Sequence, residues 1–229
     1  SLTNTSISYK KGLTSISINP AGSIIAGGSE DGNIKLWEAD SGKEIKAIIR
    51  NPHPVICVAF APDGNIVAAG LESGDIVLWD INYKERIKTL KGHNARVNSI
   101  KFNKDGSLLV SASNDKSVKI WDMNSGNEAK TLRHADNVLS VDIASDGKTI
   151  LSGSRDGSAT IWDMASGGEL LKISADSVSI NSVGISADGR YVATGSLGGI
   201  IKVWDAGSGE EKLAIDGQKG GIAVGEGLK

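Results

Sequence analysis

The stretch that decides the fold lies near the middle of the chain, where residues 97–122 read VNSIKFNKDGSLLVSASNDKSVKIWD. Apolar and β-branched residues dominate three runs in it, at 97–102, 108–113 and 118–122. Asn, Asp, Gly and Lys residues separate the runs, and a further turn leads to a fourth run at 128–132. Short runs bounded by such residues are typical of antiparallel strands joined by tight turns. The stretch therefore predicts a four-stranded unit.

The same unit recurs along the whole chain. Its clearest marks are the five tryptophans, spaced 42, 42, 41 and 42 residues apart, at Trp37, Trp79, Trp121, Trp162 and Trp204. Asp follows four of them, and Glu38 follows the first. A fixed period in this range indicates an array of similar supersecondary units. Helical periodicity is absent, so the sequence predicts an all-β chain.

One four-stranded sheet of about 40 residues cannot bury both of its faces, so the units must pack on one another. With its five tandem copies, the chain resembles the WD40-repeat family from residue 12 to about residue 216. The resemblance implies a β-propeller of four-stranded antiparallel blades, with five recognisable repeats and an incomplete sixth. The expected repeats cover about 12–50, 51–91, 92–132, 133–174 and 175–216.

The two ends of the chain leave the number of blades open. Residues 1–11 are expected to form an outer strand or clasp, and 217–229 a partial next repeat or a disordered tail. One interpretation is a segment of a longer propeller, whose other blades are missing or come from another chain. The other is a closed ring of five blades. An open array would expose apolar blade faces that drive association, so self-association or completion of the ring by another chain is expected.

The resemblance also implies a buried hydrogen-bonded set of His, Ser, Asp and Trp within a repeat. A charged Asp needs strong donors when buried, and a hydroxyl can link an imidazole to an indole N–H. Two repeats hold the full set, namely His93, Ser111, Asp115 and Trp121, and His134, Ser152, Asp156 and Trp162. The other three repeats depart from it, with Tyr9, Asn51 and Asp176 at the His position. We expect those three to be less rigidly braced.

In the family, partners usually bind the top face, formed by residues at the start of the first strand and in the turn between the second and third strands. Carried onto this chain, these positions are Ile56, Arg96, Asn98, Leu139 and Asn181, and Glu30, Glu72, Asn114, Arg155 and Leu197. The set contains no Trp or Tyr, which are frequent interface anchors. Ile56, Leu139, Arg96 and Arg155 are the better anchor candidates.

Composition and charge exclude several classes of partner. A net charge of −2 provides no field that would attract nucleic acid or an anionic membrane. No apolar run is long enough to span a bilayer. The one cysteine, Cys57, excludes an intramolecular disulfide framework and suits a reducing, cytoplasmic location.

Catalytic and metal-binding readings also fail. His93 and His134 occupy equivalent places in different repeats, so they do not converge on a metal, and we expect no metal and no cofactor. The recurrence of a His, Asp and Ser grouping in two repeats indicates bracing, because a nucleophile is needed once. Gly147-Lys148-Thr149 lacks the earlier glycine of a phosphate-binding loop.

The sequence therefore predicts a non-catalytic scaffold that binds protein or peptide partners on the propeller top face or rim. The alternative is a regulatory or sensor module of a larger multidomain enzyme whose catalytic domain is outside this chain. A propeller enzyme that works through its central channel is a weaker alternative, since no polar groups are singled out for it.

Overall fold

The fold is taken from a computed structural model, which describes residues 12–83, 85–217 and 221–224. The expected clasp at 1–11, which includes Tyr9, lies outside the described residues. Within the described ranges the secondary structure consists of strands and turns, which confirms the all-β prediction. No helix in this part of the chain is long and apolar enough to cross a membrane.

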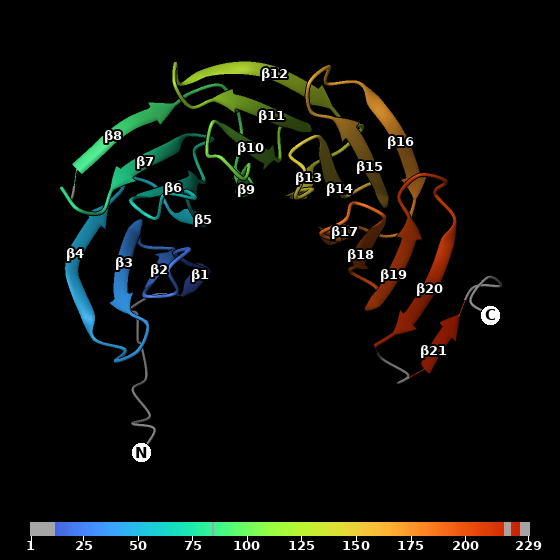
Figure 1. Ribbon diagram of the computed structural model, residues 1–229, viewed down its shortest axis with the longest axis horizontal. Coiled ribbons are helices and arrows are strands. Elements are labelled where there is room, and N and C mark those ends of the chain that lie inside the picture. Colours follow the sequence, from blue (N-terminus) through green and yellow to red (C-terminus); the bar gives the residue numbers. More distant parts are fainter. Residues whose placement is uncertain (1–11, 84, 218–220, 225–229) are drawn as a thin grey trace. The chain divides into compact units, whose positions relative to one another are not determined.

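The described strands form five antiparallel sheets, and strand order within each sheet follows the chain (Figure 1). Sheet 1 consists of β1 (Leu13–Ile18), β2 (Ile24–Ser29), β3 (Asn33–Glu38) and β4 (Glu44–Arg50). Sheet 2 consists of β5 (Val55–Phe60), β6 (Ile66–Leu71), β7 (Ile76–Asp80) and β8 (Glu85–Leu90). Sheet 3 consists of β9 (Val97–Phe102), β10 (Leu108–Ser113), β11 (Ser117–Asp122) and β12 (Asn127–Arg133).

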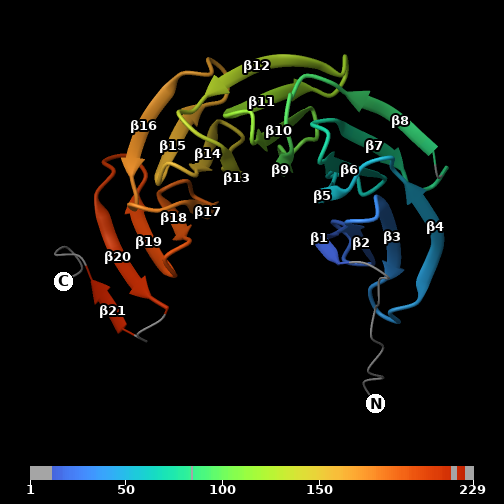
Figure 2. The same cartoon turned by 180° about the vertical axis from the view of Figure 1, so that it is seen from behind.

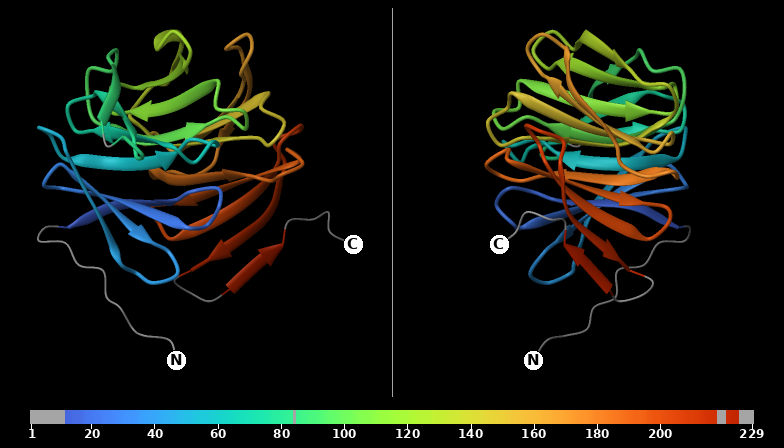
Figure 3. Two further views of the ribbon diagram at one scale, coloured as in Figure 1. Left: turned by 60° about the vertical axis from the view of Figure 1, so that its left-hand side comes forward. Right: turned by 90° about the vertical axis from the view of Figure 1, so that its right-hand side faces the viewer.

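The remaining two sheets follow the same plan. Sheet 4 consists of β13 (Val138–Ile143), β14 (Thr149–Ser154), β15 (Ser158–Asp163) and β16 (Glu169–Ser174). Sheet 5 consists of β17 (Ile180–Ile185), β18 (Tyr191–Ser196), β19 (Ile200–Asp205), β20 (Glu211–Asp216) and β21 (Gly221–Val224). The strands of each sheet are twisted relative to one another (Figure 3), as adjacent strands usually are.

Sheet 5 differs from the others by its fifth strand. In a partial next repeat, one of the two expectations for 217–229, the first strand would begin a new sheet. In the structure β21 pairs with β20, the outer strand of sheet 5 (Figure 2), with Ile215 opposite Ile222.

The chain divides into two compact units, and the boundary runs through sheet 3. Unit 1 comprises the described residues up to Leu109 together with Asp122–Glu128. Unit 2 comprises Val110–Trp121 and the described residues from Ala129 onward. In unit 1, buried residues of sheets 1 and 2 form one apolar cluster that includes Leu36, Val55 and Leu71. In unit 2, a second cluster joins sheets 4 and 5 through residues such as Leu151, Ile161 and Ile180.

Glycines in the second strands allow neighbouring sheets to approach closely. A Cβ at Gly70 would lie 2.7 Å from Val97 Cγ1, and one at Gly153 would lie 2.8 Å from Ile180 Cγ2. A Cβ at Gly28 would collide with Val55. These glycines therefore receive the first residue of the next sheet's first strand.

Side chains of β1 and β13 cover the edge of the first strand of the following sheet. Ser15 Oγ accepts a hydrogen bond from the backbone N–H of Val58 at 3.1 Å, and Ser17 Oγ accepts one from Phe60 at 3.2 Å. In unit 2, Ser140 Oγ accepts from Val183 N–H at 3.2 Å. Unpaired strand edges are sites of unwanted pairing. The hydroxyls satisfy edge groups that no neighbouring strand reaches.

A backbone bond also joins the second turn of a sheet to the first residues of the following repeat. The Asn51 N–H donates to Gly32 O at 2.8 Å, and His134 N–H donates to Lys116 O at 2.9 Å. Gly32 has a φ of 81°. A Cβ there would collide with Asn51 O. Lys116 occupies the corresponding place in sheet 3 with a φ of 67° and is the one non-glycine residue of the described chain with positive φ.

Candidate functional site

The set predicted for the fourth repeat is built around one buried hydroxyl. Ser152, on β14, is fully buried. Its Oγ accepts a hydrogen bond from Trp162 Nε1 at 2.7 Å and lies 2.8 Å from His134 Nε2. The rings of His134 and Trp162 meet edge to face with centroids 5.4 Å apart. One hydroxyl thus links an imidazole to an indole.

The protonation of His134 follows from its surroundings. Burial lowers the pKa of the ring to about 4, and the charge of Lys172 acts in the same direction. The carboxylate of Asp156 opposes this shift electrostatically. His134 is therefore neutral near pH 7, which suits a structural hydrogen bond.

Asp156 itself acts on the turn between β14 and β15. Its Oδ1 accepts hydrogen bonds from the backbone N–H of Ser158 at 2.9 Å and from the Ser158 hydroxyl at 2.6 Å. Within the described residues, no hydrogen bond joins Asp156 to His134. Three of the four predicted side chains, His134, Ser152 and Trp162, thus meet at one hydroxyl, whereas Asp156 bonds to Ser158.

The third repeat has the same elements in place. Trp121 Nε1 donates to Ser111 Oγ at 2.8 Å. Asp115 accepts from the hydroxyl of Ser117 at 2.6 Å, and His93 is buried. That these sets brace their sheets remains a prediction.

The repeats that lack the full set differ among themselves. In sheet 5, Trp204 Nε1 still donates to a hydroxyl, Thr194 Oγ1, at 3.0 Å. In sheet 2 the corresponding residue is Ala69. Trp79 Nε1 is buried there without a hydrogen-bond partner among the described residues, and so is Asn51 Oδ1.

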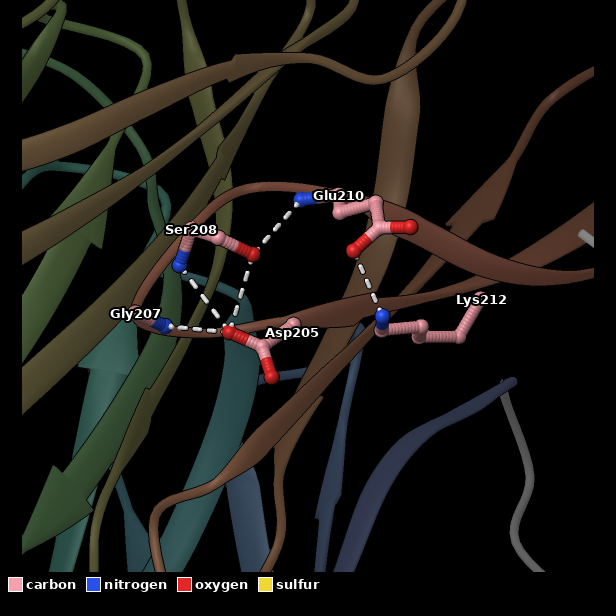
Figure 4. A network of polar contacts seen from close by, with 5 residues as sticks. All are labelled: Asp205, Gly207, Ser208, Glu210 and Lys212. Carbon is pink, nitrogen blue, oxygen red and sulfur yellow. Dashed lines mark hydrogen bonds and ion pairs between the residues drawn. The ribbon is translucent and has the colours of Figure 1, made fainter. Parts of the chain in front are cut away.

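A second polar network, which the sequence reasoning missed, involves the Asp that follows four of the five tryptophans. Asp205 Oδ1 accepts hydrogen bonds from the N–H of Gly207 at 3.1 Å and from the N–H and hydroxyl of Ser208 at 2.9 and 3.0 Å (Figure 4). Lys212 Nζ, at the start of β20, lies 2.6 Å from Oε2 of Glu210 in the same turn. Asp122 and Asp163 accept from Ser125 and Ser166 in the same way.

These bonds fix the turn between the third and fourth strands. The backbone and side chain of Ser208 hold the pKa of the Asp205 carboxyl below its usual range. Asp and Ser side chains commonly stabilise turns through such local bonds. The sequence did contain a signal for this network. In the recurring Trp-Asp and Ser-Gly pairs, the Ser follows the Asp by three residues.

In unit 1, the predicted top-face positions lie at one end of each sheet. Glu30 N–H donates to Gly12 O at 3.1 Å, and Glu72 N–H donates to Pro54 O at 3.0 Å. These bonds join the second turn of a sheet to the residues just before its first strand. Among the unit 1 candidates, Glu30, Glu72 and Arg96 are exposed, Asn98 is half-buried, and Ile56 is 8% exposed.

Unit 2 repeats the arrangement. Arg155 N–H donates to Asn137 O and Leu197 N–H donates to Ser179 O, both at 2.8 Å. Arg155, Asn181 and Leu197 are exposed, and Leu197 is exposed to 68%. Asn114 and Leu139 are half-buried.

A groove in unit 1 crosses the first strands β1, β5 and β9. It encloses about 650 Å³ and is lined by residues that include Ile56, Cys57 and Lys104. Burial raises the pKa of the Cys57 thiol to about 12, which keeps it protonated and unreactive. No group of three or more His, Cys, Asp or Glu side chains that could hold a metal occurs in the described part of the chain.

Comparison with known families identifies the fold. A family model described as the IFT122 first beta-propeller matches residues 54–224. The chain belongs to this family. A second model, described as the WD domain, G-beta repeat, matches residues 2–38. The five sheets are thus blades of a WD40 β-propeller, which confirms the predicted fold class. WD40 propellers in general bind proteins and are non-catalytic.

Proposed function

We propose that this propeller domain is a scaffold that binds protein or peptide partners on its top face. The observation that carries the proposal is the repeated backbone bond between the second turn and the residues before the first strand. In blades 1, 2, 4 and 5 it holds both groups of candidate positions at the same end of the blade. Membership of a WD40 family supports the proposal, since such domains generally act through protein contacts.

The side chains at this end of unit 2 favour a particular kind of partner. Leu197 presents an apolar side chain exposed to 68%, and an exposed Arg155 lies on the adjacent blade. Asn181 adds an exposed amide at the same end of sheet 5. An extended segment with an apolar residue close to an Asp or Glu would satisfy these groups, because a burial and a charge-assisted bond are then made together.

A matched pair of charge reversals tests the assignment. Arg155→Glu alters the proposed face, and Lys148→Glu makes the same change in the turn at the opposite end of β14. Both side chains are exposed. The purified domain is cross-linked to its bound partners, and the amount of partner recovered with it is measured. We expect this amount to fall by about tenfold for Arg155→Glu and to stay unchanged for Lys148→Glu. Equal recovery with both folded variants would contradict the top-face assignment.

The proposal does not extend to nucleic acids or membranes. The net charge of −2 supplies no field for phosphate groups. An intracellular location is part of the proposal, and the buried free thiol of Cys57 supports it.

A further inference from the structure

One contact recurs between consecutive blades, and it has two complementary halves. The first half is an aliphatic residue at the start of a first strand, which we call the knob. The second is a glycine on the second strand of the preceding blade, which we call the socket. Val55 on Gly28, Val97 on Gly70 and Ile180 on Gly153 are the examples within the two units.

Knobs that have a socket are completely buried. Val55, Val97 and Ile180 are each 0% exposed. The next two apolar residues on the same face of β5 are also covered, since Val58 is 6% and Phe60 is 9% exposed. Burial of the knob is therefore the normal state of this contact.

Blade 1 presents the same half without cover. Leu13, which matches Val55 by the period, is 49% exposed. Ile16 and Ile18, which match Val58 and Phe60, are 66% and 55% exposed. Three large aliphatic side chains on one short strand form an apolar patch of the kind that marks an interaction site.

Blade 5 presents the other half without an occupant. At Gly195, which matches Gly153, a Cβ would meet nothing closer than its own blade's Ser182 at 3.8 Å. Ile201 lies opposite Gly195 in the β18–β19 ladder and is 47% exposed. Its counterpart Ala159, opposite Gly153, is 0% exposed.

Hydrogen-bonding groups on blades 1 and 5 also lack the partners that the same groups have between consecutive blades. In the described blades, Ser15 and Ser140 accept from the N–H groups of Val58 and Val183 on the following blade. Ser182 matches Ser140 and is exposed without such a donor among the described residues. The backbone N–H of Ile16 matches that of Val58 and has no hydroxyl acceptor in the described part of the chain.

We propose that a second copy of this chain docks blade 1 onto blade 5, with Leu13 in the Gly195 socket and the Ile16 N–H on Ser182 Oγ. The chain carries both halves of a contact that it already uses between its own blades. Each half on an end blade lacks what the other supplies. Such a contact is heterologous, so it forms rings or open arrays instead of a twofold dimer.

Two variants that each destroy one half provide the test. Leu13→Arg removes the knob and keeps the socket, and Gly195→Arg blocks the socket and keeps the knob. Leu13 is 49% exposed and a Cβ at Gly195 would meet nothing closer than 3.8 Å, so circular dichroism and Trp fluorescence should match the unaltered chain. Ser145→Arg, at an exposed turn of blade 4, adds the same charge away from both surfaces.

The unaltered chain and Ser145→Arg are expected to associate with rising concentration in sedimentation or light-scattering measurements. Each of the two junction variants alone should weaken association by at least about tenfold. A mixture of the two should form a complex of two chains, because one intact knob and one intact socket remain. Ser182→Ala should weaken that complex by about threefold to tenfold.

Several results would overturn the proposal. One is a monomeric unaltered chain at every concentration measured. Another is a mixture of Leu13→Arg and Gly195→Arg that associates no better than either variant alone. Association that persists in both single variants would show that another surface is responsible. None of these outcomes bears on the top-face proposal, which concerns the ends of the blades and not their flat faces.

Discussion

Blades 4 and 2 share one framework but hold their tryptophans differently. In blade 4, Ser152 accepts from Trp162 and contacts His134 at hydrogen-bond distance. In blade 2, Ala69 replaces the serine, Asn51 replaces the histidine, and Trp79 Nε1 is left without an acceptor in the described part of the chain. Both blades nevertheless form the same four strands in the same register.

The difference separates what forms a blade from what stabilises it. Strand pattern, turn residues and apolar burial are common to both blades, and they suffice for the architecture. The buried hydroxyl adds partners for two ring nitrogens, and an unpaired buried donor has a cost of about 1–3 kcal/mol. Blade 2 therefore carries a polar defect within a well-packed core.

Removal of the central hydroxyl should make blade 4 resemble blade 2. We expect Ser152→Ala to lower the free energy of unfolding by about 2–4 kcal/mol, because two buried ring nitrogens lose their partner. Chemical denaturation followed by Trp fluorescence measures this. Ser145→Ala, at an exposed turn of the same blade, should stay within about 0.5 kcal/mol. Similar losses for both variants would contradict a bracing role for Ser152.

Acid should weaken blade 4 through His134. Its folded-state pKa of about 4 lies below the ordinary value of 6.5. As the pH falls from about 6.5 towards 4, the unfolded chain binds a proton that the folded chain does not, so stability contributed above pH 6.5 is lost, by about 2–3 kcal/mol.

The variant His134→Asn places in blade 4 the residue that blade 2 has. Its stability should change less over this pH range than that of the unaltered chain, while other carboxylates titrate equally in both. Parallel stability curves for the two proteins would show that His134 is not the group responsible.

The turn carboxylate should matter less than the hydroxyl. Asp156→Ala removes the acceptor of the Ser158 hydroxyl and N–H, and Ser158 is 4% exposed. We expect a loss of about 1–2 kcal/mol. Ser73 stands at the matching place in blade 2 and is exposed, so Ser73→Ala should change stability by less than about 0.5 kcal/mol. Equal effects would mean that the carboxylate has no special role.

The smallest effect is expected from a repair of blade 2. Ala69→Ser introduces a hydroxyl at the position of Ser152, within reach of Trp79 Nε1 by analogy with the other blades. A gain of about 0.5–1.5 kcal/mol follows from one new buried hydrogen bond, provided that the small extra volume fits. Denaturation midpoints of the two proteins would measure the gain. A loss of stability would indicate that packing around Ala69 leaves no room for an oxygen.

Much of the fold could be predicted from the sequence because its signals are local. The run at 97–102 and the turns around Gly106 and Asp115 specify strands and hairpins without reference to distant residues. The contacts between blades were harder to foresee. Gly28, Gly70 and Gly153 read as interior strand glycines until Val55, Val97 and Ile180 are seen against them.

The residues of the candidate site could be predicted from the sequence, but not all of the hydrogen bonds that join them. The pairing of Ser152 with His134 and Trp162 matches a recurring sequence offset. The place of the Asp156 carboxylate, on Ser158 instead of His134, depends on the exact conformation of one turn. Exposure also required the structure, since Ile56 and Leu197 are similar residues in the sequence but are 8% and 68% exposed.

The bond from Asn51 to Gly32 has a consequence for how the chain is made. The Asn51 side chain also reaches Gly32 O, and these residues are separated by 19 positions. A blade can therefore be closed over a short loop once the first residue of the following repeat has left the ribosome, before the strands of that repeat exist. Contacts that form over short loops are entropically inexpensive and fast. The blades would then fold one at a time during synthesis. The face of each finished blade that receives the next blade would stay uncovered until that blade forms.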